Sequence, residues 1–143
     1  MLVTPGNLSA LDATGVAPST KLWSALVVAT NQRNPPAPPP ALAPYVPVLT
    51  RTFGYNRFDL INERLAVPGH NDDRWLVPST ELFLQLQPRP GGDSHRAFYL
   101  VRLFQKDRPL FASEIGLADG SPLYIRGPLW GQGQLLLILE RRP

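Results

Sequence analysis

The chain contains no cysteine, and among its 143 residues it has only two lysines and two histidines. Without cysteine, the protein cannot form disulfides, thiolate zinc sites, iron–sulfur clusters or a thiol nucleophile. No apolar run approaches the roughly 18 residues of a membrane span. A basic region followed by an apolar run, which marks a secretory signal, is also missing from the first residues. We therefore expect a cytoplasmic protein without a membrane span.

Charged residues are scarce as well. They make up 17% of the chain against 43% hydrophobic residues, and the formal net charge is only +3. Disordered chains combine low hydrophobicity with high net charge, so this composition predicts a folded core of ordinary domain size. Twelve of the 14 basic residues are arginines, and the pI is near 9.7. This balance permits an anionic partner but does not require one.

Proline is the residue present in excess. Seven of the 17 prolines lie within residues 34–47. Proline fixes φ and has no amide hydrogen, which predicts an extended connector rather than a helix interior or a central strand. Two alternatives stay open for this stretch: a ligand for a proline-recognising groove, and an extended arm that lies on a partner.

The connector divides the chain into two predicted parts. Residues 1–47 are expected to form an N-terminal arm with one apolar segment, residues 18–31. The Ser-Thr pair at 19–20 is typical of a helix start, whereas the β-branched residues between 27 and 30 favour a strand; we prefer the helix. Residues 48–143 are expected to form a β domain that folds without the arm.

Alternation of apolar and polar residues predicts most strands of the β domain. Leucines at every second position of residues 80–87 predict a half-buried strand, with Gln85 on the solvent side. Residues 97–115 predict a hairpin with a polar tip, and residues 123–140 predict a second hairpin with a longer, glycine-rich loop. Within the latter, the apolar run 135–139 predicts a strand covered on both faces.

Two further segments complete the predicted domain. Residues 46–53 alternate and are expected to be a strand, while residues 55–67 fit a helix and a strand equally well. Strands with short turns outnumber helices throughout. The predicted fold is therefore mainly β, a small antiparallel β-sandwich or barrel with one or two short helices and a Pro-rich N-terminal arm.

The glycine-rich loop 127–133 holds the best candidate for contact with a partner. It lacks the Gly-Lys-Ser/Thr ending of a phosphate-binding loop and precedes no helix, so no nucleotide site is expected there. Trp130, in the middle of the loop, either packs on the sheet as core or projects as an anchor for a protein. Together with Gly127 and Arg126 it forms the predicted partner-binding set.

A second candidate surface interleaves arginines with aromatic residues. Arg51, Phe53, Tyr55 and Arg57 lie close together along one predicted strand. Their rings could stack bases and their guanidinium groups could hold phosphates of single-stranded nucleic acid. Aromatic packing between strands explains the same residues without nucleic acid.

Support for catalysis is slight. His70 and His95 lie in polar, turn-like segments, and the Asn-Asp-Asp sequence after His70 is typical of a solvated turn. Histidines beside carboxylates can also bind a metal or act as a base. No Gly-x-Ser-x-Gly elbow is present. We therefore assign no catalytic residue, metal ligand or cofactor.

These observations favour a non-enzymatic protein-interaction module, an accessory or assembly subunit of a larger cytoplasmic complex. A single-stranded nucleic-acid-binding β domain is the alternative, and a small hydrolase or metal-dependent enzyme is the third reading. The salt dependence of binding separates the first two, because phosphate contacts weaken steeply as salt rises.

Overall fold

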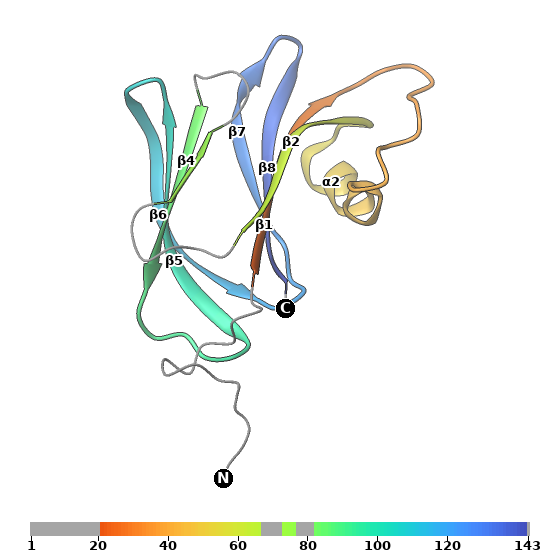
Figure 1. The fold of residues 1–143 in the computed structure, drawn as a ribbon. Helices are drawn as coiled ribbons and strands as arrows, with labels where there is room; N and C mark the ends of the chain where they lie inside the picture. Colours follow the sequence, from red (N-terminus) through yellow and green to blue (C-terminus); the bar gives the residue numbers. More distant parts are fainter. Residues whose placement is uncertain (1–20, 67–72, 77–81, 143) are drawn as a thin grey trace.

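The structure is a computed structural model that describes residues 21–66, 73–76 and 82–142. Within these residues, eight strands form two four-stranded sheets that pack face to face as a sandwich (Figure 1). All the paired strands are antiparallel. The predicted fold class, a mainly β sandwich with a short helix, is confirmed.

The first sheet has the strand order β2-β1-β8-β7, and the second has the order β3-β4-β5-β6. The strands of the first sheet are β1 (Lys21–Thr30), β2 (Arg57–Ala66), β7 (Leu123–Trp130) and β8 (Gly133–Arg142). Those of the second are β3 (Asp73–Leu76), β4 (Leu82–Arg89), β5 (Arg96–Gln105) and β6 (Arg108–Ala118). A 3₁₀ turn, η1 (Ala43–Tyr45), and a helix, α2 (Val46–Phe53), connect β1 to β2.

The main core lies between the two sheets. Alternate leucines of β4 point into it, as predicted, and Leu84 is fully buried together with Val101 and Leu137. The prediction for Gln85 is wrong, since this side chain is only 6% exposed. Its amide oxygen accepts a hydrogen bond from Arg102 Nη1 at 3.2 Å, which satisfies a polar group that solvent barely reaches.

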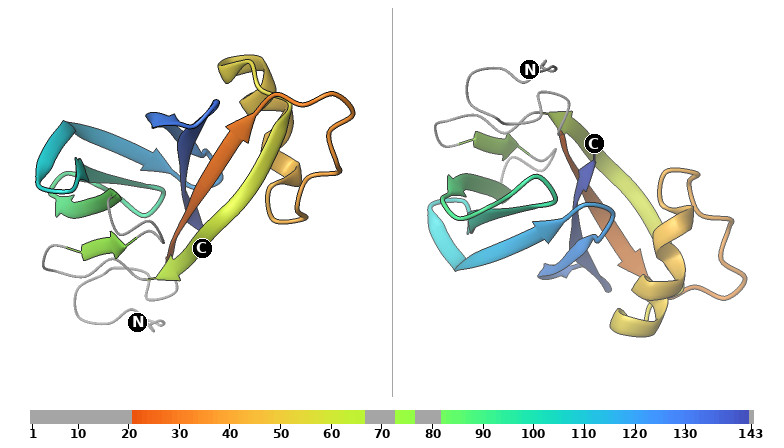
Figure 2. Two further views of the ribbon diagram at one scale, coloured as in Figure 1. Left: turned by 90° about the horizontal axis from the view of Figure 1, so that it is seen from above. Right: turned by 90° about the horizontal axis from the view of Figure 1, so that it is seen from below.

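A second core covers the other side of the first sheet. There the helical segment, residues 42–53, packs its side chains Leu42, Tyr45 and Leu49 against the sheet. Figures 1 and 2 show this segment on the side of the first sheet that faces away from the second. Residues 135–139 of β8 contribute alternately to the two cores and are all buried, which confirms the strand covered on both faces.

The preferred helix for residues 18–31 is wrong where the structure describes it. Residues 21–30 are strand β1, which pairs with β2 on one side and with β8 on the other. Residues 22–27 are all buried, so the strand has no polar face and lacks the alternation that identifies half-buried strands. The division of the chain at residue 47 does not hold either, because β1 belongs to the middle of the first sheet.

The Pro-rich stretch is only partly the connector that we expected. Residues 35–39 form no helix or strand, but η1 and α2 begin within the stretch. Pro44 and Pro47 occupy first-turn positions of η1 and α2, where a missing N–H leaves no hydrogen bond unmade. The strand predicted for residues 46–53 is therefore wrong, since Val46, Leu49 and Phe53 have a spacing that also fits one side of a helix.

Both predicted hairpins are present, but their turns are shorter than expected. Only Lys106 and Asp107 separate β5 from β6, and β7 continues to Trp130, which pairs with Gly133. The predicted seven-residue loop at 127–133 is therefore a two-residue turn that follows an irregularity in β7. Gly131, with φ of +62°, provides the left-handed conformation that this turn requires.

Candidate functional site

The tip of the β7–β8 hairpin carries two neighbouring apolar side chains outside both cores. Leu129 is 75% exposed and Trp130 is 38% exposed. The hairpin reaches the end of the sandwich opposite the C-terminus (Figure 1). Leu129 pairs with Gln134 and Trp130 with Gly133, so the two side chains belong to opposite faces of the hairpin. The tip is thus apolar on both faces.

Buried polar contacts hold this tip in place. Gln134 is 6% exposed, donates a hydrogen bond from Nε2 to the Gly127 carbonyl at 3.0 Å, and accepts one from the Tyr55 hydroxyl at 3.3 Å. A Cβ on Gly127 would lie 2.9 Å from the Leu135 carbonyl oxygen, so only glycine allows β7 and β8 to approach here. Gly127 therefore supports the tip rather than presenting a contact of its own.

Arg126 connects the two surfaces that the sequence suggested separately. Its guanidinium lies 5.2 Å from the centre of the Phe53 ring, a cation–π distance. Tyr55 also contacts the β7–β8 hairpin, since its hydroxyl donates a hydrogen bond to Gln134. The predicted partner-binding set and the predicted nucleic-acid set thus meet beside the C-terminal end of α2.

The expected strand of arginines and aromatics at residues 51–57 does not exist. Arg51 and Phe53 belong to α2, a turn follows, and Arg57 opens β2. Arg57 donates a hydrogen bond from Nε to Asp59 at 2.9 Å, while Phe53 and Tyr55 are engaged by Arg126 and Gln134. Of the four, only Arg51 is largely exposed to solvent in this arrangement.

The candidate catalytic histidines do not form a site in the described residues. His70 lies outside them. The His95 side chain is 86% exposed, and its Nδ1 lies 3.8 Å from an oxygen of Asp119. Across residues 21–66 and 82–142, no group of three His, Asp or Glu side chains is placed to hold a metal ion.

A cluster that the sequence did not indicate fastens the helical segment to the first sheet. The rings of Tyr45 and Trp23 stack at 5.3 Å, and the Arg142 guanidinium lies 4.2 Å from the Trp23 ring. The Tyr45 hydroxyl donates to Glu140 at 2.6 Å and accepts from Arg142 at 2.8 Å. Burial, reinforced by the hydrogen bond to Glu140, raises the pKa of Tyr45 above its ordinary value.

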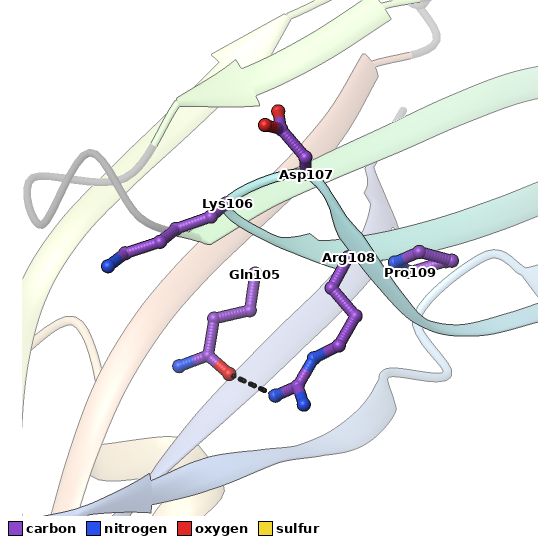
Figure 3. A pocket seen from close by; sticks show the side chains of 5 residues that line it. All are labelled: Gln105, Lys106, Asp107, Arg108 and Pro109. Atoms are coloured by element: carbon purple, nitrogen blue, oxygen red, sulfur yellow. Dashed lines mark hydrogen bonds between the residues drawn. The ribbon is translucent and has the colours of Figure 1, made fainter.

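A surface hollow of about 690 Å³ lies at the turn between β5 and β6 (Figure 3). Arg108 donates a hydrogen bond to the Gln105 side chain at 3.2 Å within it. Lys106, Asp107 and Pro109 complete the described lining, which includes no histidine or hydroxyl nucleophile. The hollow therefore adds no catalytic group to the site.

No protein-family model, curated protein or solved structure matches this chain. None of the helices in the described residues is long and apolar enough to span a membrane.

Proposed function

We propose that this chain is a non-enzymatic protein-interaction module, an accessory or assembly subunit of a larger cytoplasmic complex. The observation that carries the proposal is the exposure of Leu129 and Trp130 at the end of a hairpin whose base is buried. An exposed tryptophan on a rigid frame loses little conformational entropy on binding, and such residues dominate the energy of protein interfaces.

The form of the tip indicates how a partner is bound. With apolar side chains on both faces, the tip buries most area when it inserts into a pocket of the partner. Addition of a strand along β7 is less favourable, because Pro128 has no N–H to donate to a neighbouring strand. Arg126 lies near the base of the tip, where an arginine can bind carboxylates or carbonyls at the rim of an interface.

Site-specific photo-crosslinking tests this proposal in the intact protein. A photoreactive phenylalanine analogue replaces Trp130 in one variant and Leu65 in a control variant; the Leu65 side chain is 50% exposed on β2, the opposite edge strand. In the native host, we expect a discrete crosslinked protein from position 130 and none from position 65. Identical products from both positions, or none from position 130, contradict the proposal.

A truncation separates binding from stability. Trp130→Ala is expected to leave the melting temperature nearly unchanged, since the ring belongs to neither core, and to weaken complex formation at least tenfold. A loss of stability of about 3 kcal/mol or more is the cost of removing a core aromatic. That result would assign Trp130 to the core and leave the tip without an anchor.

The other two readings have less support. The residues of the nucleic-acid set at 51–57 are largely engaged in contacts within the chain, and they do not share a strand. An enzyme needs a nucleophile, base or metal site, and the exposed His95 has only the carboxylates of Asp93 and Asp119 near it among the described residues.

A further inference from the structure

The outer face of the second sheet differs from every other face of the sandwich. Along β5, the side chains at 99, 101 and 103 point into the main core, whereas alternate side chains point outward. None of the outward residues belongs to either core. We call these residues the β5 face: Arg96, Phe98, Leu100, Arg102 and Phe104.

No described helix or strand covers the β5 face. The helical segment lies on the far side of the first sheet, as the two views of Figure 2 show. The neighbouring strands cover the face unevenly: β6 places the small residues Gly116 and Ala112 opposite Phe98 and Arg102, whereas on β4 the buried Gln85 lies beside Arg102. A Cβ on Gly116 would lie 2.8 Å from the Arg96 guanidinium and 3.1 Å from the Phe98 ring, so both groups extend over this glycine.

The rings of the face are arranged for stacking. Phe104 pairs across the strands with Phe83 of β4. Successive outward positions of a strand are separated by about 7 Å, so Phe98 and Phe104, three such positions apart, are two platforms about 20 Å apart on one line. The Arg96 guanidinium lies 5.3 Å from the centre of the Phe98 ring. A base can stack on an aromatic ring or on a guanidinium plane.

The positive charge of the face is not neutralised by the protein. Neither Arg96 nor Arg102 has a carboxylate within ion-pair distance in the described part of the chain. Glu114, opposite Leu100 on β6, pairs instead with Arg89 at 3.1 Å. Two arginines thus remain available to an anionic partner, and they oppose the approach of a second copy through the same face.

We infer that the β5 face binds single-stranded nucleic acid. Bases stack on Phe98, with its covering guanidinium, and on Phe104, while phosphates bind Arg96 and Arg102. This combination of cations and aromatic rings on an open antiparallel sheet is the arrangement that single strands require, and paired bases in a duplex cannot use the rings. The surface is distinct from the β7–β8 tip, so neither assignment depends on the other.

Fluorescence anisotropy with labelled oligo-dT and oligo-U tests the inference on the full chain. We expect binding that weakens with salt, with a log–log slope of about −0.7 for each phosphate contact and therefore about −1.4 in total. The double variant Arg96→Gln/Arg102→Gln should weaken binding at least tenfold and flatten the slope toward zero. Phe98→Leu should weaken binding roughly tenfold and leave the slope unchanged, since it removes only stacking.

The matched control removes the same charge elsewhere. Arg33→Gln/Arg64→Gln changes two exposed arginines, one just after β1 and one in β2, and should alter affinity less than twofold. Because Arg102 supports Gln85, the single variant Arg96→Gln provides a second test: a slope flatter by about 0.7 with an unchanged melting temperature.

Three results would overturn the inference. One is the absence of binding to either oligonucleotide at low salt. Another is an equal loss of affinity in the two double variants, which indicates non-specific attraction. The third is binding of polyglutamate but not of the oligonucleotides, which assigns the β5 face to an acidic protein segment.

Discussion

The outer faces of the two sheets differ in how far other parts of the chain cover them. On the first sheet, apolar side chains such as Trp23 and Leu136 face outward and are sealed by the helical segment. On the second sheet, arginines and half-buried phenylalanines face outward, and no described element covers them. The centre of the first sheet is thus buried on both faces, whereas the outer face of the second sheet keeps partly accessible side chains.

The residue patterns of the strands at the centre of each sheet reflect this difference in coverage. In β8, residues 135–139 are a continuous apolar run because both faces are covered. In β5, buried and partly exposed positions alternate because one face is covered. The cluster of Tyr45, Glu140 and Arg142 then holds the helical segment against the first sheet, and the second sheet has no counterpart among the described residues.

Removal of β1 is the most severe way to break the first sheet. A chain of residues 34–143 loses the strand between β2 and β8 and is expected to show no cooperative thermal unfolding. Circular dichroism during heating provides the measurement. A cooperative transition would restore the division into arm and β domain that the sequence suggested.

Matched polar substitutions on the two outer faces should differ in effect. Leu136→Gln places an amide among the apolar side chains of the second core and should lower the free energy of unfolding by about 3 kcal/mol or more. Leu100→Gln, on the β5 face, should stay within about 1 kcal/mol of the parent chain. Urea denaturation measures both, and equal losses would mean that the second sheet is also sealed.

Alkaline pH should weaken the packing of the helical segment against the first sheet. Burial raises the pKa of Tyr45 and of Tyr124 in the folded protein, and burial also raises that of Tyr99 in the main core. Below pH 10.0, the ordinary pKa of tyrosine, all three side chains are protonated in both the folded and the unfolded protein. Above that pH the unfolded chain loses these protons first, because its tyrosines have the lower pKa. Stability should therefore fall as pH rises beyond 10.

The variant Tyr45→Phe isolates one part of this effect. It removes the hydrogen bond to Glu140, which should cost about 1 kcal/mol at neutral pH, and it should reduce the alkaline loss. Stability that is constant or rising between about pH 10 and pH 11 would contradict the assignment of these pKa shifts.

Local patterns were enough for part of this fold. The leucines of β4 and the apolar run of β8 predicted their strands because burial on one or two faces leaves a direct trace in the sequence. The prediction of a helix for β1 is wrong because this strand has no polar face and so lacks the alternation typical of a strand. The prediction of a strand for α2 is wrong because its valines and leucine fit the two-residue period of a strand as well as the 3.6-residue period of a helix.

The surface was harder to predict, since it depends on contacts between distant residues. Trp130 was identified correctly as a residue at the end of a hairpin, but pairing with Gly133 shortened its loop to a turn. The contact of Arg142 with Tyr45 joins residues 97 positions apart, which no local pattern reveals. The β5 face likewise became visible only once strand register had placed small residues of β6 beside Phe98 and Arg102.

Because the chain contains no cysteine, thiol labelling can measure directly how accessible the two outer faces are. Leu100→Cys places one thiol on the β5 face, and Ile138→Cys places one beneath the helical segment. Under native conditions, a maleimide should label the first thiol quickly and the second at least ~100-fold more slowly, because the buried site reacts only after opening. Comparable labelling rates in two folded variants would mean that the helical segment does not protect the first sheet, and would contradict the difference in coverage between the two outer faces.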